Sequence, residues 1–276
     1  MMPSFALFRL PYSSKCMLIE QSSGQLEELA DCTDLNGRKG FVVAPFAPSA
    51  ENPILLIRPD RMKTIEFDDK REQILQYFAL SLDMLDNDYK LSTQEQPPVG
   101  QPSKDYHEDF ERFHNAVSWG DFKKLVLSRS IEMERTAGSP SPFDLFYKAW
   151  AFYPRVMVCL VCTPRTGLWL AATPEILLSS PDQYRWHTVA LAGTKQHGDK
   201  NGWSDKNIQE QRYVASYLAE RLSIFDDNYS EQGPITVQAG HLEHLRSDFY
   251  FGMKEQNRVG DLLQLLHPTP AVCGLP

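Results

Sequence analysis

The order of the apolar runs constrains the fold of this chain more than any other feature of the sequence. Short runs rich in β-branched and aromatic residues, typical of strands, come in groups, and three of them lie in residues 4–10, 40–46 and 53–59. Longer stretches with helical spacing, at 106–117 and about 204–225, stand between groups of strands instead of alternating with single strands. The pattern therefore favours an antiparallel or mixed α+β protein over a doubly wound parallel fold.

The composition changes after residue 91. Residues 92–105 (STQEQPPVGQPSKD) are polar and contain three prolines, which is the composition of a linker or exposed loop. Before this segment, residues 1–91 are expected to form a β-rich N-terminal subdomain with a helix near 70–88. After it, residues 106–276 are expected to form a second domain. A chain of 276 residues is long enough for two such domains.

The net charge limits the partners of the protein. A formal charge of −8 and a pI near 5.4, without a dense basic run, argue against a nucleic-acid or anionic membrane surface. No apolar run is long enough to span a membrane, and five irregularly spaced cysteines suggest reduced thiols. His241 and His244 lack an evident third metal ligand and are expected to pack or hydrogen-bond. We expect a cytoplasmic monomer.

Two adjacent lysines begin the apolar run in GDFKKLVLSRS, residues 120–130. In a strand starting there, side chains alternate between faces, so Lys124 shares a face with Val126 whereas Lys123 does not. A lysine becomes a general base if burial lowers its pKa from about 10.4 towards about 7–8. Lysines at strand ends are more often solvated, and the pattern leaves both interpretations open.

Two glutamates are candidates for acid chemistry and metal binding. Glu175 follows Pro174 at a bend, where burial would raise its pKa towards the range of a general acid, although an exposed turn residue is the commoner case. Glu210 lies four residues before Val214 on the predicted helix, beside its apolar face. A carboxylate in that position is a reasonable Mg²⁺ ligand, and the alternative is a surface ion pair.

A small-residue corner interrupts the run TVALAGTKQ. Ala192, Gly193 and Thr194 could bring backbone N–H groups close to an anionic ligand. The corner is not a Walker A loop, because Thr188 stands where the first glycine of that motif belongs. Taken alone, this signal is weak.

The motifs KLVLSR, TPEILL, LAGT, KNIQEQ and LHPTPAVCGLP, in this order, resemble the chorismate-utilising enzymes. This family comprises isochorismate, salicylate, anthranilate and aminodeoxychorismate synthases, and the resemblance covers roughly residues 105–276. It implies a layered α+β fold of packed, mainly antiparallel β-sheets covered by helices. It also implies that 106–276 is the chorismate-binding catalytic domain and that chorismate is the substrate.

The resemblance assigns a role to each candidate residue. Lys124 matches the lysine that activates water in the isochorismate and salicylate members, whereas the ammonia-using members typically carry glutamine there. Ala192 replaces the lysine typical of aminodeoxychorismate synthases, which disfavours that activity. Glu175 is implied as the general acid and Glu210 as the Mg²⁺ ligand, in a helix motif where EQ replaces the usual EH. The remaining residues implied to line the substrate pocket are Gly193, Thr194, Thr269, Ala271 and Gly274.

The activity expected from this resemblance is that of a Mg²⁺-dependent isochorismate synthase, which adds water at C2 of chorismate while the C4 hydroxyl leaves. Such enzymes serve menaquinone or siderophore synthesis. The alternatives are a salicylate synthase or a non-catalytic chorismate-binding remnant. Family members continue beyond the HPTPAxxG turn with an RGxYAG-like motif and a late glutamate that binds Mg²⁺. We therefore expect a C-terminally truncated member with little or no activity as it stands.

Overall fold

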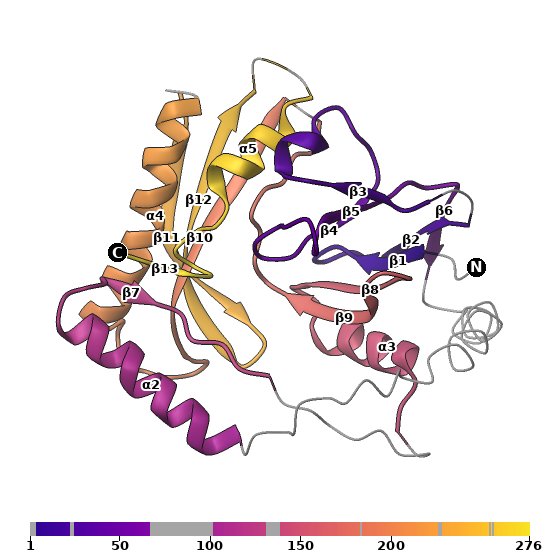
Figure 1. Ribbon diagram of the computed structural model, residues 1–276. Helices are drawn as coiled ribbons and strands as arrows, with labels where there is room; N and C mark the ends of the chain where they lie inside the picture. The colour runs from indigo at the N-terminus through magenta and orange to yellow at the C-terminus, as the bar shows by residue number, and fades with distance from the viewer. Residues whose placement is uncertain are drawn as a thin grey trace. The chain divides into compact units, whose positions relative to one another are not determined.

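The computed structural model describes residues 4–22, 25–66, 102–130, 139–182, 184–225, 228–253, 255 and 257–276. The chain forms two compact units that interleave in sequence (Figure 1). Unit 1 takes residues 1–29, 39–99 and 133–174, and unit 2 takes residues 30–38, 100–132 and 175–276. The helix predicted near 70–88 lies outside the described residues.

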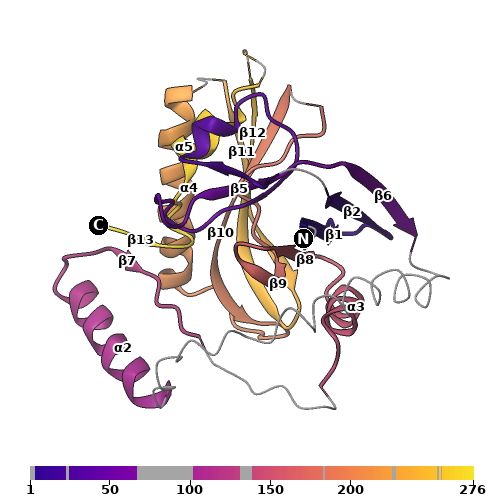
Figure 2. The same cartoon turned by 45° about the vertical axis from the view of Figure 1, so that its right-hand side comes forward.

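Unit 1 is built on a five-stranded sheet in which every pairing is antiparallel. Its order is β6 (Arg61–Glu66), β2 (Lys15–Gln21), β1 (Ser4–Arg9), β8 (Met157–Thr163) and β9 (Gly167–Thr173). A smaller antiparallel sheet has the order β3 (Glu27–Leu29), β5 (Ile54–Ile57) and β4 (Phe41–Val43). Helix α3 (Pro142–Phe152) packs on the larger sheet (Figure 2).

The alternation of side chains along β1 explains why both faces of the larger sheet are covered. Phe5 and Leu7 belong to a buried cluster that includes Phe146 of α3. Ala6, which points to the other face, packs with Ile57 of β5 in a second cluster. Helix α3 begins at Pro142 because the Ser141 hydroxyl caps its first turn. The core of unit 1 therefore lies on both sides of β1.

Unit 2 combines a three-stranded antiparallel sheet with helices. Its strand order is β10 (Arg185–Gln196), β12 (Leu242–Gly252) and β11 (Ser230–Ala239). The long helix α4 (Asp205–Phe225) runs along this sheet and buries Val214, Leu218 and Leu222 against it (Figure 1). The remaining elements are η1 (Cys32–Leu35), α2 (Pro102–Ser118), α5 (Val259–Leu266) and a ribbon of β7 (Lys124–Leu125) with β13 (Gly274–Leu275).

The predicted fold class, an α+β protein with mainly antiparallel sheets and packed helices, is confirmed by these elements and their pairings. The helix predicted at 106–117 is part of α2, which begins at Pro102, inside the segment expected to be a linker. Residues 92–101 of that segment lie outside the described part of the chain. The domain boundaries remain a prediction, although residues 139–174 join the N-terminal strands in unit 1, where β8 pairs with β1.

Two apolar runs of the sequence, KLVLSR and EILLSS, form less strand than their composition suggests. The strand that starts at Lys124 ends at Leu125, although the N–H of Val126 still donates to the carbonyl of Cys273 (3.2 Å). The run EILLSS forms no strand, and within it only Ser179 makes a bridge, to His187. The carbonyl of Leu177 accepts a hydrogen bond from the side-chain hydroxyl of Thr188, which is not a backbone pairing of strands. Among the described residues, no helix is both long enough and apolar enough to cross a membrane.

Candidate active site

The β7–β13 ribbon sets the position of Lys124. The N–H of Lys123 donates to the carbonyl of Leu275 (2.9 Å), and the N–H of Val126 donates to that of Cys273 (3.2 Å). Gly274 has φ +126°, and a Cβ there would meet the backbone carbonyl of Lys124. Only glycine accommodates this conformation together with this close approach. The glycine of the terminal turn therefore allows two distant segments to pair directly behind the lysine.

The two lysines have different environments, as the alternation predicts. Lys123 is exposed, whereas the side chain of Lys124 is only 10 % exposed. The Lys124 Nζ donates to the carbonyl of Pro270 (2.5 Å) and lies 3.7 Å from Oε1 of Glu210. Burial lowers the pKa of the Lys124 amine, and the negative charge of Glu210 opposes this shift. The lysine is therefore more easily deprotonated than an ordinary solvated one.

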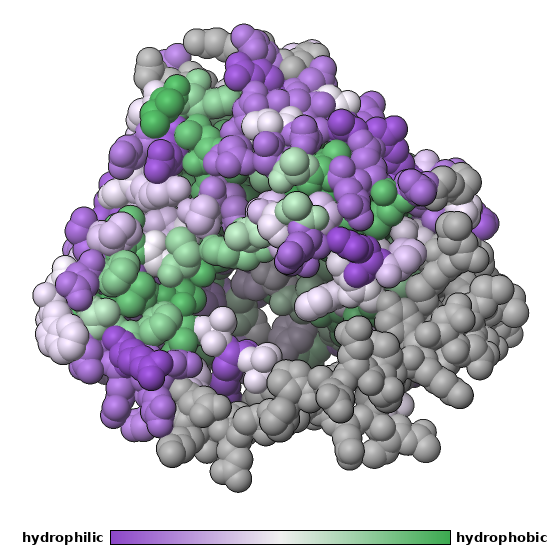
Figure 3. All heavy atoms as spheres, viewed as in Figure 1, coloured by the Kyte–Doolittle hydropathy of each residue, from purple (hydrophilic) through white to green (hydrophobic). Residues whose placement is uncertain are grey.

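Hydrophobic side chains surround the ribbon. Figure 3 shows them gathered over the part of unit 2 that carries β7 and β13. Val126 and Val272, on either side of the ribbon, are among the exposed apolar residues of the chain. The ribbon therefore carries exposed apolar side chains on the surface of unit 2.

Glu175 lies in the irregular segment that follows Pro174 and is half-buried. Burial raises the pKa of its carboxyl group, and the positive charge of Lys124 partly offsets this effect. The two groups are therefore close enough to influence each other. Their pKa values are shifted in opposite directions, so the surroundings of each group make its neutral form easier to reach than in a solvated group.

Glu210 projects from α4 with its side chain 30 % exposed, and its carboxylate faces the Lys124 amine. Its charge also acts on His244 of β12. Burial lowers the pKa of His244, against the opposing influences of a hydrogen bond with the Gly193 backbone and of the Glu210 charge. Thr194 and His244 are linked between Oγ1 and Nδ1 at 3.1 Å. A neutral imidazole therefore connects the small-residue corner to the carboxylate.

The small-residue corner is a β-bulge. The pairing of β10 with β12 shifts register between Ala192 and Thr194, and Gly193 has φ +74°. A Cβ on Gly193 would lie 2.8 Å from the carbonyl oxygen of Asn207 in the first turn of α4. The amide of Asn207 donates to the Thr194 carbonyl (3.3 Å). Because Gly193 has no side chain, α4 can approach the bulge at Asn207. Asn207 is three residues before Glu210 on the same helix.

The turn that leads into β13 supplies the remaining predicted residues. The side chain of Thr269 is buried, and its carbonyl accepts from the N–H groups of Val272 (3.1 Å) and Cys273 (3.3 Å). Ala271 packs against the buried cluster formed by α4 and the strands of unit 2. Through this packing the turn presents the Pro270 carbonyl to Lys124.

The structure brings most of the predicted residues together within unit 2. Direct contacts or electrostatic effects connect Lys124, Glu175 and Glu210, and the bulge joins them through His244. Two participants were not predicted as site residues: His244, whose pKa the Glu210 charge affects, and the carbonyl of Pro270, which accepts from Lys124. The sequence does not identify His244 as a site residue, because its hydrogen-bond partner Thr194 is 50 residues away. The register of β10 against β12 brings the two residues together.

Glu210 is the one predicted metal ligand. Among the described residues, no group of three or more His, Cys, Asp or Glu side chains could enclose a metal ion. Mg²⁺ often takes only one or two protein carboxylates and keeps water or substrate oxygens as its other ligands. A single, partly exposed carboxylate fits that mode of binding, so Glu210 could hold Mg²⁺ together with a substrate carboxylate.

The chain is similar in sequence to known proteins. A family model described as chorismate binding enzyme matches residues 58–276. The chain is 29 % identical over 164 residues to isochorismate synthase EntC of Escherichia coli K12, covering 55 % of this chain and 41 % of EntC. It is 27 % identical over 199 residues to isochorismate synthase DhbC of Bacillus subtilis, covering 65 % and 49 % respectively.

A solved structure has the same fold. DhbC from Bacillus anthracis superposes with a TM-score of 0.72 at 19 % identity, covering 99 % of this chain and 75 % of that one. The curated relatives are longer than this chain. It spans 41 % of the length of EntC and 49 % of that of the Bacillus subtilis protein.

Proposed function

The chain belongs to the chorismate-binding enzyme family, and on this premise we propose that it converts chorismate to isochorismate. The relatives named isochorismate synthases support this reaction over the others of the family. The observation that carries the proposal is the pair of Lys124 and Glu175, whose pKa values are shifted in opposite directions. Such a pair supplies a base and an acid at the same pH.

The reaction adds one water molecule and releases another. Neutral Lys124 takes a proton from the entering water at its Nζ, and the water oxygen bonds to C2 of chorismate. The ring double bonds shift as the C–O bond at C4 breaks. Glu175 gives its proton to the C4 oxygen, which leaves as water. Atoms balance, so the product is an isomer of the substrate, and each residue changes protonation state once.

The surrounding residues hold the substrate. The bulge at Gly193 and Thr194 and the turn from Thr269 through Ala271 to Gly274 are proposed to line its pocket. Glu210 would hold Mg²⁺, which when bound offsets the negative charge of a substrate carboxylate. The hydrogen bond to Pro270 keeps Lys124 Nζ pointing into the site (2.5 Å).

The test compares two adjacent lysine variants. Purified chain is incubated with chorismate and Mg²⁺, and isochorismate is quantified by chromatography. Lys124→Ala should lower the rate by about 10²–10⁴-fold, the usual contribution of a general base. Lys123→Ala, the matched control on the exposed neighbour, should stay within about twofold. Equal, measurable rates for wild type and Lys124→Ala would refute the proposal, and no conversion by the wild type would favour the non-catalytic alternative.

The same assay separates the alternatives. A salicylate synthase would release pyruvate, which lactate dehydrogenase detects. A non-catalytic binding protein would show no product and no response to Lys124→Ala. The expectation of little or no activity from these 276 residues remains a prediction, and detectable Mg²⁺-dependent conversion by the wild-type chain would refute it. The expected monomer is tested by light scattering.

A further inference from the structure

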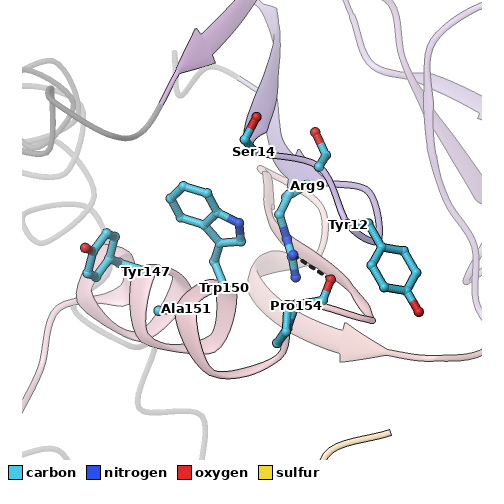
Figure 4. Close-up of a pocket in the computed structure, with 8 residues that line it drawn as sticks. Arg9, Tyr12, Ser14, Tyr147, Trp150, Ala151 and Pro154 are labelled. Carbon is cyan, nitrogen blue, oxygen red and sulfur yellow. Dashed lines mark hydrogen bonds between the residues drawn. The ribbon is translucent and has the colours of Figure 1, made fainter. Parts of the chain in front are cut away.

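Unit 1 contains a cavity that includes none of the residues assigned to the proposed reaction. It has a volume of about 500 Å³ and lies between the turn after β1 and the C-terminal half of α3. Ligand pockets in proteins typically measure about 300–1,000 Å³, so a single-ring molecule would fit. Its walls include Arg9, Ser14, Tyr147 and Trp150 (Figure 4).

Arg9 brings a buried positive charge to this cavity. The residue is 2 % exposed, and its guanidinium donates to the backbone carbonyls of Tyr153 (2.5 Å), Pro154 (2.9 Å) and Val156 (2.9 Å). These carbonyls follow the end of α3, where a cation is favourable. They are neutral acceptors, however, and no described carboxylate lies within ion-pair distance of Arg9. Its charge is therefore not neutralised.

The hydrogen-bonding capacity of Arg9 is also incompletely used. Its Nε is buried and has no hydrogen-bond partner among the described residues. Its Nη1 donates to Pro154, and the second hydrogen that this atom carries has no described acceptor. Buried charges in proteins are normally paired, so an unpaired one beside a cavity calls for an anion.

The other walls of the cavity are aromatic and hydroxylic. Tyr147 and Trp150, three residues apart on α3, pack edge to face with ring centres 6.1 Å apart. Figure 4 shows Trp150 between Tyr147 and Arg9, with Ser14 across from it. Ser14 is exposed, and its hydroxyl makes no hydrogen bond to a described residue. The cavity therefore offers a flat apolar surface, a free hydroxyl and a positive charge side by side.

The backbone at the mouth of the cavity is strained. Tyr12 has φ +62°, an uncommon conformation for an aromatic residue, and its side chain is 77 % exposed. Its N–H donates to the carbonyl of Pro154 (2.9 Å), the same oxygen that Arg9 contacts. This bond ties the strained turn to the charged wall. Strain of this kind is concentrated at functional sites.

We propose that this cavity binds a small ligand in which a carboxylate is attached to a single flat ring. The carboxylate accepts from Nη1 of Arg9 and from the Ser14 hydroxyl, and it neutralises the guanidinium. The ring lies against Trp150. The two requirements act together, so neither a bare anion nor an uncharged ring satisfies the site.

Three probes test this proposal by calorimetric titration of the whole chain: benzoate, benzyl alcohol and inorganic phosphate. Benzoate should bind saturably in about the millimolar range, as expected for so small a ligand. Benzyl alcohol and phosphate should bind at least about tenfold more weakly, because each lacks one of the two required features. The proposal fails if benzoate does not bind, or if phosphate or benzyl alcohol binds as tightly as benzoate does.

Variants locate the binding. Ser14→Glu places a like charge on the wall without touching the core and should weaken benzoate binding at least about tenfold. Thr64→Glu, an equal charge change on the exposed face of β6, is the matched control and should leave affinity within about twofold. Lys124→Ala should also leave it unchanged, whereas binding lost in Lys124→Ala and kept in Ser14→Glu would assign benzoate to the other site and overturn the proposal.

Discussion

Replacing Gly193 by alanine tests how the bulge of β10 positions α4. Two effects act at this residue, and both follow from its surroundings. Its φ of +74° lies in the left-handed region, which costs an alanine about 1–2 kcal/mol. In addition, the new Cβ would stand 2.8 Å from the carbonyl oxygen of Asn207, well inside normal contact. Relieving the contact requires α4 to shift, and such overpacking costs about 1–3 kcal/mol.

Together these effects should lower the free energy of unfolding by about 2–5 kcal/mol, corresponding to a Tm lower by about 4–20 °C. Urea denaturation followed by tryptophan fluorescence measures the change. Gly198→Ala separates the two causes, because Gly198 has φ +85° but a Cβ added there would have no heavy atom within 4 Å. It should show the conformational cost alone. Gly202→Ala meets neither obstacle and should be neutral or slightly stabilising.

The losses of stability in the three glycine variants show whether the close approach of α4 to the bulge constrains the structure. If Gly193→Ala is no more destabilising than Gly198→Ala, the close approach of α4 to the bulge does not constrain the structure. If it is more destabilising, the same shift of α4 should also reduce chorismate conversion, since Glu210 is three residues beyond Asn207. A variant that loses stability and keeps full activity would contradict the proposed link between bulge and carboxylate.

Two further predictions concern ionisation. The raised pKa of Glu175 means that the folded protein resists its ionisation, so stability is lost as pH rises from the usual carboxyl range through the folded-state pKa. Glu175→Gln should therefore raise Tm at pH 7–8 and leave it unchanged near pH 4, and a loss at pH 7–8 would contradict this reasoning. Glu210→Gln removes the charge that raises the pKa of Lys124 and should lower that pKa further. Competitive acetylation across pH in Mg²⁺-free buffer, with Lys123 as the internal reference, measures this shift, and an upward shift would refute it.

Features set by local sequence were predictable. The alternation of a strand distinguishes Lys124 from Lys123, and the observed exposures differ as expected. The start of α3 follows from Ser141 and Pro142, because a hydroxyl before a proline satisfies the first free N–H groups of a helix. The small residues around Gly193 predicted a corner in the strand, and the structure has a β-bulge there. The approach of its backbone N–H groups to an anionic ligand remains a prediction.

Features set by pairing between distant segments were not predictable. The short length of β7 depends on β13, about 150 residues later, and no local pattern reports the length of a partner. The run EILLSS is apolar enough for a strand, yet only Ser179 makes a bridge, to His187. The contact of His244 with Thr194 depends on the register of two strands and on the bulge that shifts it. Register is decided by packing over the whole sheet, which a single segment does not encode.

The environment of Lys124 explains why three separate segments are needed for one base. A lysine buried alone would lose its charge, but its position would be undefined, because a long side chain keeps considerable rotamer freedom. The Pro270 carbonyl fixes the amine, and Glu210 holds it from the side of α4. Glu210 also raises the pKa of the amine, so burial has to outweigh the ion pair for Lys124 to act as a base. The 10 % exposure of the side chain provides that burial, and the lack of a side chain on Gly274 allows β13 to approach the Lys124 backbone closely.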